Sequence, residues 1–250
     1  MNFQNRKQII LEKLETDHSA DVRELATLLA TSEITVRRDL NILAEKGLLY
    51  RTHGGAMKLS LSKDKPNFIH KSAARAEQKD QICAIAAAQI EEGDVIFMDC
   101  GSTVYRLCPF IRNKRIKVVT NSIPVVNALL GSSVSLNFAG GEIDMERQAS
   151  HGKIAIEHFA RYCADKAFLG VDGISAQKGL SAASEKEAEI TLTLKQHSKQ
   201  TYLLCDSSKF EQDRYLPFAP LNFPDFIITN QDANLEIIEK YRSLGAKILY

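Results

Sequence analysis

Long apolar runs are missing from this chain of 250 residues. No run approaches the ~20 apolar residues that a membrane-spanning helix needs, and the polar N-terminus has no signal-peptide core. We therefore expect a protein of the cytoplasm that has no membrane partner.

Paired cysteines are missing as well. The five cysteines form no Cys-x-x-Cys pair and have no histidine nearby at metal-ligand spacing. An odd number without a framework suits a reduced cytosolic protein, and several lie inside apolar runs, where small buried hydrophobic residues are the simpler interpretation. We expect neither a metal ion nor another cofactor. The five are Cys83, Cys100, Cys108, Cys163 and Cys205.

An excess of positive charge is also missing. The formal net charge is +1, and residues 1–57 hold eight Lys and Arg against eight Asp and Glu. Bulk electrostatic attraction therefore cannot support an interaction with nucleic acid. Any DNA binding must depend on where single basic residues lie and on two or more copies that occupy repeated half-sites, as in a homodimer or homotetramer.

Residues 32–56, SEITVRRDLNILAEKGLLYRTHGGA, predict a helix that is followed by a short strand. Ser32 is a good N-cap, because its hydroxyl can accept a hydrogen bond from a free N–H of the first turn. Gly47 suits the left-handed position just past a helix end. An apolar stripe at positions i, i+4 and i+7 consists of Val36, Leu40 and Leu43.

Basic and polar residues lie away from that stripe. Arg38 and Asn41 are opposite it, and Thr35 and Arg37 flank it. An exposed arginine can hold a phosphate or bind guanine with two hydrogen bonds in the major groove. An ordinary amphipathic surface helix with solvated arginines has the same pattern, so the helix alone leaves both interpretations open.

The residues upstream favour the DNA-binding interpretation. Residues 5–15 have helical spacing, and Asp21 can cap a second helix that ends at a short break at residues 30–31. Three short helices, the third with exposed arginines, followed by a two-stranded ribbon make a winged helix-turn-helix.

Residues 5–57 resemble the DNA-binding domain of the DeoR/GlpR family of bacterial sugar-metabolism regulators. The matching residues are Glu24-Leu25-Ala26, Ser32 to Leu40, Leu43, Gly47, Leu48, Arg51 and His53-Gly54-Gly55-Ala56. The resemblance implies that Thr35, Arg37 and Arg38 contact DNA and that Arg51 and His53 lie near its backbone or minor groove. For Asp39 we expect a role in orienting the arginines or in an internal cap. The full DNA-binding set that we expect is Ser32, Thr35, Arg37, Arg38, Asn41, Arg51 and His53.

The rest of the chain is long enough to form a second domain with its own core. Residues 58–71 contain LSLSKDKPNF, which breaks any period, and a helix is predicted from about Ser72 to Glu92. We predict a winged helix-turn-helix domain at residues 1–57, a linker at 58–74 and an α/β effector-sensing domain at 75–250.

Apolar strand-like runs alternate with helical stretches in this second domain. Unbroken Val, Ile and Leu runs between helices are typical of parallel strands buried on both faces, so we predict a mostly parallel α/β open sheet. The predicted strands are 95–98, 118–120, 134–139, 167–171, 202–205 and 226–229, with a last one at 247–249. The predicted helices are 103–111, 123–130, 152–162, 185–197 and 233–243.

Polar turns follow the predicted strands at their carboxyl ends, where ligands bind in such sheets. After the first strand, Gly101 allows a close turn, Ser102 and Thr103 offer hydroxyls, and a helix N-terminus offers free N–H groups, which suits phosphate. Each turn alone could simply start a helix, but five occur at successive strand ends. The other four are Thr120-Asn121-Ser122, Gly140-Gly141, Asp172-Gly173 and Asp206-Ser207-Ser208-Lys209.

Residues 75–230 resemble the sensor domain of the same DeoR/GlpR regulators, whose fold is similar to that of ribose-5-phosphate isomerase, glucosamine-6-phosphate deaminase and CoA transferases. The matching segments include residues 99–103, 119–122, 140–141, 165–170, 172–174, 187–189 and 206–210. The resemblance implies a phosphorylated sugar or related metabolite as effector. The effector-binding residues that we expect are Asp99, Gly101, Ser102, Thr103, Asn121, Gly141, Asp172, Gly173 and Lys209.

Two departures from the family pattern occur. Cys100 stands where the family often has Ser or Ala, and Thr191 stands where it usually has a basic residue. The second departure bears on the class of effector. His151 precedes Gly152 in what we predict to be a loop. Its side chain could contact a ligand, or it could be an ordinary histidine of a surface loop.

Together these features predict a DNA-binding transcriptional regulator, a repressor of a carbohydrate-metabolism operon, that is released by the metabolite. The alternative is a sugar-phosphate isomerase or deaminase with an accessory DNA-binding domain. Such an enzyme needs a positioned general base, for which Asp99, Asp172 or Glu185 could serve. No Asp/His or Glu/Lys pairing is evident in the sequence, and the DNA-binding half has no purpose in an enzyme, so we expect no catalytic residue.

Overall fold

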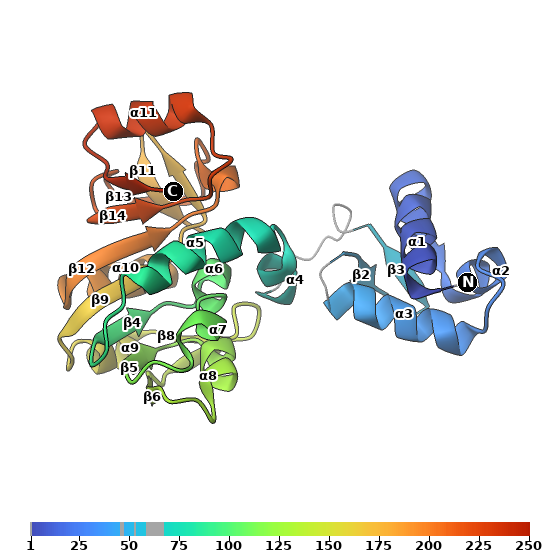
Figure 1. Cartoon of the computed structure of the whole chain (residues 1–250), viewed down its shortest axis with the longest axis horizontal. Helices are drawn as coiled ribbons and strands as arrows, with labels where there is room; N and C mark the ends of the chain where they lie inside the picture. Colours follow the sequence, from blue (N-terminus) through green and yellow to red (C-terminus); the bar gives the residue numbers. More distant parts are fainter. Residues whose placement is uncertain (1, 46–47, 53, 59–67) are drawn as a thin grey trace. The chain divides into compact units, whose positions relative to one another are not determined.

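The computed structural model describes residues 2–45, 48–52, 54–58 and 68–250. By its internal contacts the chain divides into two units, Met1–Ala74 and Arg75–Tyr250. The smaller unit contains the N-terminal helices and a small sheet, and the larger unit contains a long parallel sheet (Figure 1). Among the described residues, no helix combines the length and the apolar character that a membrane crossing requires.

Three helices form the smaller unit's core, as the sequence predicts. They are α1 (Phe3–Asp17), α2 (Val22–Leu28) and α3 (Glu33–Glu45), and α4 (Phe68–Ala73) follows later in the chain. Asp21 caps α2 by accepting a hydrogen bond from the Arg23 N–H. The apolar stripe of α3 is fully buried, with Val36, Leu40 and Leu43 each 0 % exposed.

The wing is larger than the predicted two-stranded ribbon. Its antiparallel strands are β1 (Ser19–Asp21), β2 (Tyr50–Arg51) and β3 (Gly55–Met57), with β3 in the middle. The third strand, β1, is the segment that links α1 to α2. A side chain at Gly55 would place its Cβ 2.1 Å from the Ala20 carbonyl oxygen, so only glycine permits the two strands to approach this closely.

Seven parallel strands form the central sheet of the larger unit, and each overlaps one of the seven predicted strands. Their spatial order is β15-β14-β12-β9-β4-β5-β6, and every neighbouring pair is parallel. The fold-class prediction is therefore confirmed. The strands are β4 (Val95–Met98), β5 (Lys117–Thr120), β6 (Ser135–Phe138), β9 (Ala164–Leu169), β12 (Ser198–Leu204), β14 (Phe226–Ile228) and β15 (Ile248–Leu249).

Helices cover both faces of this sheet. Successive side chains of a strand point to opposite faces, and each face has its own apolar cluster that the helices complete. Ile96 and Met98 pack with the helices on one face, and Phe97 packs with those on the other. The first face carries α5 (Ala76–Ala88), α6 (Ser102–Tyr105), α7 (Cys108–Ile111) and α8 (Ile123–Leu129). The second carries α9 (Lys153–Phe159), α10 (Glu185–Gln196) and α11 (Leu235–Ser243).

Two predicted helices are interrupted. The helix expected from Ser72 to Glu92 is split into α4 and α5, because Arg75 adopts a left-handed conformation with φ 56°, and it ends early, with Gln89 as its C-cap. The helix expected at 103–111 is split into α6 and α7, since Pro109 has no N–H and starts a new helix. In the expected linker, residues 59–67 lie outside the described residues, and α4 occupies its end.

Short antiparallel strands were not predicted. A hairpin of β7 (Glu142–Asp144) and β8 (Ala149–His151) follows β6, and β10 (Gly173–Ser175), β11 (Gly179–Ala182) and β13 (Leu216–Ala219) form a separate sheet. The expectation of a loop around His151 is wrong, since this residue lies in β8 and is 2 % exposed.

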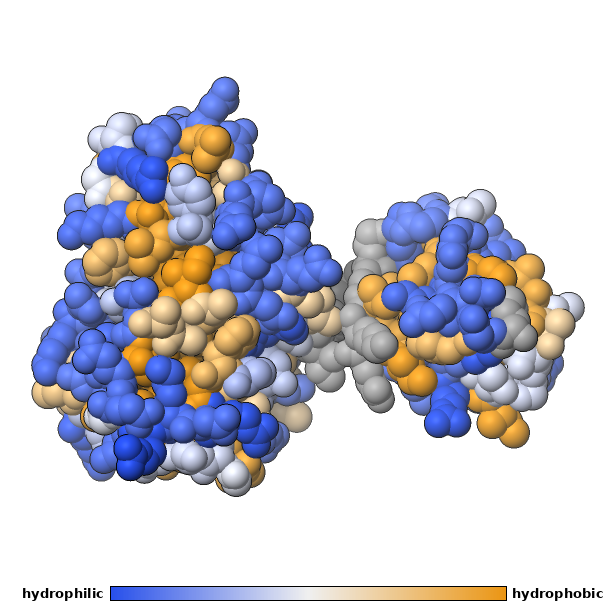
Figure 2. All heavy atoms as spheres, in the orientation of Figure 1, coloured by the Kyte–Doolittle hydropathy of each residue, from blue (hydrophilic) through white to orange (hydrophobic). Residues whose placement is uncertain are grey.

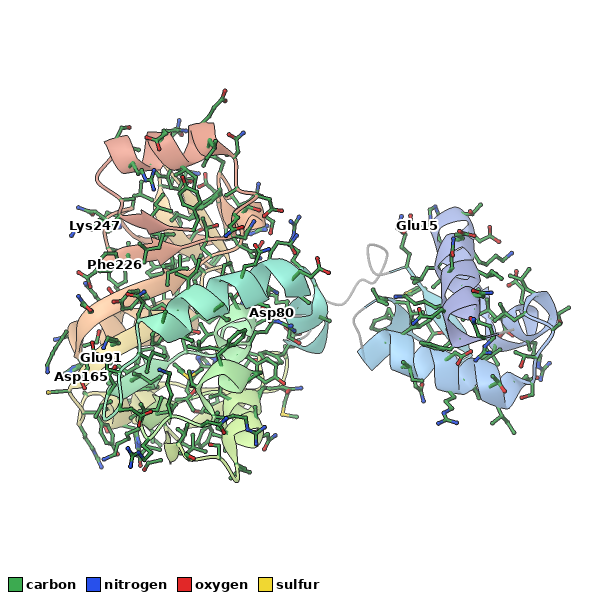
Figure 3. All side chains as sticks on the ribbon, viewed as in Figure 1. Glu15, Asp80, Glu91, Asp165, Phe226 and Lys247 are labelled. Carbon is green, nitrogen blue, oxygen red and sulfur yellow. The ribbon has the colours of Figure 1, made fainter. Side chains whose placement is uncertain are left out.

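Ion pairs join neighbouring strands at the amino edge of the parallel sheet. Asp94 pairs with Lys166 at 2.7 Å, and Asp165 accepts hydrogen bonds from the Val95 N–H at 2.9 Å and from Lys199 at 2.8 Å. Figure 3 shows Asp165 near Glu91, at the end of α5 that is distant from Asp80. These ion pairs link neighbouring strands. The first turn of α5 lies at the opposite, carboxyl edge of the sheet, where Lys79 reaches Ser102.

The visible surface of the larger unit is mainly hydrophilic, with a band of apolar residues across it (Figure 2). Two aromatic side chains of neighbouring strands in this unit stack on each other, Tyr202 on Phe226, at a centroid distance of 5.3 Å. Lys247 lies over the Phe226 ring at 5.5 Å.

Candidate functional sites

Helix α3 presents a polar face to solvent. Ser32 begins it, accepting a hydrogen bond from the Thr35 N–H at 3.3 Å and sharing a second one of 2.9 Å with the Thr35 hydroxyl. Arg38 is exposed and Arg37 lies 3.5 Å from Glu33 on the preceding turn. Both arginines are therefore available to an external partner, since a pair this exposed is weak.

Arg51 of β2 joins this face. Its Nε donates to the Asn41 side-chain oxygen at 3.2 Å, and its Nη1 donates to the Gly55 carbonyl at 2.5 Å. Partial burial, and then the nearby charge of Arg37, lower the pKa of Arg51. The wing and the helix thus place two arginines close together although the domain as a whole has no excess charge. His53 lies outside the described residues.

Asp39 has a different role from the one that the sequence suggested. Its side chain is buried and accepts hydrogen bonds from Arg6 of α1, at 2.6 Å from Nε and 3.1 Å from Nη2. It does not orient Arg37 or Arg38 and ties α3 to α1. The sequence did not lead us to expect that Ile34, in the same helix, is exposed, with 80 % of its surface accessible. Its signal in the sequence is an apolar residue that departs from the helical period of the buried stripe.

The larger unit has a topological switch point between β4 and β9. The chain runs from β4 outward to β5 and β6 and then returns to β9 on the other side of β4. Ligands of open α/β sheets bind at the carboxyl edge where the strand order reverses in this way. The turn after β4 contains Asp99, Gly101, Ser102 and Thr103, so the sheet places four of the expected residues at this point.

Asp99 bridges the two strands. Its carboxylate accepts hydrogen bonds from the Gly101 N–H at 2.7 Å and the Gly170 N–H at 2.5 Å, and the side chain is buried. Burial raises its pKa to about 6, although the two backbone N–H groups oppose this; nearby Glu187 raises it further and Arg147 lowers it. A side chain at Gly101 would meet the Gly170 Cα at 3.2 Å, so the two turns touch.

Basic residues of α5 reach the same edge. Lys79 is 4 % exposed and donates to the Ser102 hydroxyl at 3.3 Å. Arg75, just before α5, lies 3.9 Å from Asp206 after β12. Lys79 was not predicted, because nothing in the sequence distinguishes it from other lysines of an amphipathic helix.

Asp172 belongs to a charged group that the sequence did not reveal. Arg147, between β7 and β8, donates to Asp172 at 2.8 Å and pairs with Glu187 of α10 at 2.6 Å. The pKa of Arg147 is raised, because the two carboxylates outweigh the opposite effect of its burial. Gly173 starts β10, where a Cβ would lie 2.3 Å from the Gln212 carbonyl oxygen.

Asn121 and Gly141 support the hairpin. Asn121 is buried and donates to the Ser150 carbonyl at 2.8 Å, and its own side-chain oxygen has no hydrogen-bond partner among the described residues. A Cβ at Gly141 would lie 2.5 Å from the His151 carbonyl oxygen. The His151 ring nitrogens likewise have no hydrogen-bond partner within the described ranges, and burial lowers its pKa.

Lys209 closes the short 3-10 helix after β12. Within the described part of the chain its ammonium group makes no hydrogen bond or ion pair. It lies at the carboxyl edge by topology, since β12 is two strands from β4 in the sheet. Thr191, where the family pattern has a basic residue, is buried in α10 and donates to the Glu187 carbonyl at 3.1 Å.

A separate hollow of about 310 Å³ lies between α5, α6, α7 and α8. It contains none of the expected effector residues, and its arginine, Arg106, is paired with Asp80 at 2.5 Å. Among the described residues, no group of three or more His, Cys, Asp and Glu side chains is arranged to hold a metal ion.

Two family profiles cover most of the chain. The family described as "DeoR-like helix-turn-helix domain" matches residues 6–60, and the one described as "DeoR C terminal sensor domain" matches residues 74–231. The matched ranges correspond to the two units of the structure.

Curated relatives match over nearly the whole length. The uncharacterized regulator FruR of Bacillus subtilis is 33% identical, with 91% of each chain covered. The lactose phosphotransferase system repressor of Lactococcus lactis is 31% identical, with 96% of each chain covered. The glycerol-3-phosphate regulon repressor of Escherichia coli is 27% identical, covering 96% of this chain and 95% of the other.

Proposed function

This chain belongs to the DeoR family of helix-turn-helix regulators, and we propose that it represses a carbohydrate-metabolism operon until a phosphorylated sugar or related metabolite releases it. The observation that carries this proposal is the exposed face of α3, where Arg37 and Arg38 stand free of the core. The relatives named as repressors of a lactose phosphotransferase system and of a glycerol-3-phosphate regulon support the class of target and of effector.

In this proposal α3 enters the major groove of operator DNA. Arg38 and Thr35 read base edges, and Arg37 binds phosphate or guanine. Arg51, fixed by Asn41 and the Gly55 carbonyl, lies beside the DNA backbone with the rest of the wing. Ser32 fixes the start of the helix, and His53 completes the set that we assign to DNA.

The effector binds at the carboxyl edge of the parallel sheet. Its phosphate is held by Ser102, Thr103 and the free N–H groups after Gly101, with Lys79 and Lys209 supplying positive charge. Its hydroxyls meet Asp99, Asn121 and Asp172. Gly141 and Gly173 allow the backbone to approach closely, and Gly101 does the same between β4 and β9.

Repression requires more than one copy of the chain. One winged helix with no excess charge makes too few phosphate contacts for tight binding, so a homodimer or homotetramer on repeated half-sites is part of the proposal. The effector acts only through its different affinity for the DNA-bound and free arrangements, a coupling of about 1–3 kcal/mol. The protein would act in the cytoplasm, without a cofactor.

The carboxylates at the sheet edge favour binding over catalysis. A general base needs a free oxygen within reach of a substrate proton. Both oxygens of Asp99 already accept backbone hydrogen bonds, and Asp172 is engaged by Arg147. We therefore propose that the protein is not an enzyme.

A DNA-release assay tests the function. The full chain is incubated with fluorescent DNA from upstream of its own operon, and anisotropy is followed while sugar phosphates are added one at a time. We expect tight binding that at least one sugar phosphate reverses, and the same compound should raise the melting temperature of the larger unit. Turnover of ribose 5-phosphate or glucosamine 6-phosphate would contradict the proposal, as would DNA binding that no phosphorylated metabolite changes.

A further inference from the structure

Ile34 is an apolar side chain that the core of the smaller unit does not use. It is the second residue of α3, and 80 % of its surface is accessible. From the same helix, the apolar cluster of this unit takes Val36, Leu40 and Leu43. An exposed β-branched residue also contributes less to helix stability than alanine or glutamate would. Neither packing nor helix propensity therefore accounts for an isoleucine at this position.

Ile34 shares the outermost line of α3 with Arg38 and Asn41, and all three are exposed. Residues four and seven positions apart differ by only about 40° and 20° around a helix, so these side chains lie on one face. Val36 is fully buried and lies about 160° around the helix from both Ile34 and Arg38. This face therefore points away from the core. In Figure 1, α3 runs along one border of the smaller unit, with α1 on its inner side.

Basic side chains accompany the isoleucine on this helix. Arg38 is the next member of the line, and Arg37 precedes it. Arg51 of the wing donates to the Asn41 side-chain oxygen at 3.2 Å, about two turns of helix from Ile34. The wing thus engages the line at its C-terminal end, and Ile34 lies at its N-terminal end. An apolar group among arginines is complementary to a partner that is anionic outside and offers an apolar group between its charges.

The major groove of double-stranded DNA offers that combination. Phosphates border the groove, and the C5-methyl group of thymine is the apolar group among the donors and acceptors that base edges present there. Recognition helices contact base edges with their N-terminal residues, and Ile34 is in the first turn of α3. Against a purine edge, an isoleucine would cover a donor or an acceptor without replacing its hydrogen bond to water, which is unfavourable.

We propose that Ile34 selects a thymine in each operator half-site by packing against its C5-methyl group. This inference rests on the proposed function, because it requires α3 to enter the major groove. It gives an apolar contact to a face on which Arg38 and Thr35 act through hydrogen bonds. Because a methyl contact carries no charge, the preference for thymine should persist at salt concentrations that weaken the phosphate contacts.

Replacement of thymine by deoxyuridine tests the proposal, since the two bases differ only in the C5-methyl group. Binding sites are first selected from random duplex DNA with the full chain. Each thymine of one selected half-site is then replaced in turn, and the affinity is measured by anisotropy. We expect one position at which the replacement weakens binding by the wild type about fourfold, the effect of about one buried methyl group. Ile34→Ala should bind the thymine and deoxyuridine duplexes of that pair equally.

Ile154→Ala is the matched control, because this isoleucine is 66 % exposed in α9 of the larger unit, and it should keep the sensitivity of the wild type. If Ile34→Ala does not fold, Ile34→Gln, a good helix former without an apolar end, takes its place. Sensitivity to the methyl group that persists without Ile34 would overturn the inference. A wild type that tolerates every replacement, or that selects a half-site without thymine, would overturn it too. These results would leave the proposed function standing, whereas both fail if the full chain selects no sequence.

Discussion

The carboxylate of Asp99 holds the Gly170 N–H at 2.5 Å, and this contact joins the ends of β4 and β9 at the point where the strand order reverses. The same side chain also holds the Gly101 N–H. One buried acid thus fixes the two turns between which we place the effector.

Asp99 makes the stability of the larger unit dependent on pH. Its pKa is raised in the folded protein from 3.8 to about 6, so folding disfavours the ionised form. The resulting destabilisation is absent well below pH 4, grows from about pH 4 and is complete by about pH 7, where it amounts to about 3 kcal/mol.

Asp99→Asn removes this dependence. Between pH 5 and pH 7.5 the free energy of unfolding of wild type should fall relative to that of the variant by roughly 1–2 kcal/mol. Urea titrations measure the free energy of unfolding of both proteins. Circular dichroism is the probe, because the chain has no tryptophan for fluorescence. A difference that stays constant over this range would mean that the Asp99 pKa is not raised.

Arg38→Ala should weaken specific DNA binding by about 10- to 100-fold, because one base or phosphate contact of about 1–3 kcal/mol is lost. Effector binding should not change. Anisotropy titrations measure the first and calorimetry the second. Arg115→Ala, with a side chain that is 86% exposed in the larger unit, is the control for lost charge; equal losses in both variants would contradict the assignment of α3.

Asp39→Ala should lower the melting temperature of the smaller unit by several degrees, because the two hydrogen bonds that Arg6 donates to Asp39 are lost. DNA affinity should fall as well, since α3 is no longer tied to α1. Asp17→Ala, an exposed acid at the end of α1, serves as the control. Wild-type stability in Asp39→Ala would show that the buried pair makes no net contribution.

Lys209→Ala should give a repressor that binds DNA normally and no longer responds to its effector, with the effector Kd raised at least about tenfold. Lys117→Ala, at the amino edge of β5, removes the same charge far from the proposed site. For both variants, the anisotropy of fluorescent operator DNA measures how much DNA is released when the effector is added. Normal release of Lys209→Ala from DNA would remove Lys209 from the site.

Gly101→Ala should destabilise the larger unit and weaken effector binding, because the new Cβ would lie 2.9 Å from an Asp99 carboxylate oxygen and 3.2 Å from the Gly170 Cα. Gly140→Ala is the matched control, since its Cβ would meet nothing within 4 Å. Thermal melts and calorimetry compare the two. If they behave alike, the turns after β4 and β9 are not held in contact.

The parallel sheet could be predicted because most of its strands contain an apolar run, such as residues 95–98 and 226–228, that is typical of strands buried on both faces. Segments such as residues 142–144 and 149–151 could not, since they are short and mix polar with apolar residues. Their pairing depends on Ala149 meeting Asp144 across a turn, which no local propensity encodes.

The turns after the strands could be predicted from Gly, Ser and Asp, but their partners could not. Asp39 and Arg6 are 33 positions apart, and Arg147 and Asp172 are 25 positions apart. A long-range ion pair leaves no periodic trace in the sequence. For the same reason the sequence places Asp99 at the edge of the sheet without showing that both its oxygens are occupied.

The residue that follows β3, the middle strand of the small sheet, is held at both its backbone and its side chain. Lys58 follows β3 directly, donates its N–H to the His18 carbonyl at 2.8 Å and pairs with Glu15 at 2.5 Å. A pulling force that enters at Lys58 would therefore act along β3 in shear against β1 and β2 together, so their hydrogen bonds would have to break at the same time. Tension applied at Lys58 would therefore meet two strand pairings at once, and the sheet would not unravel from its edge.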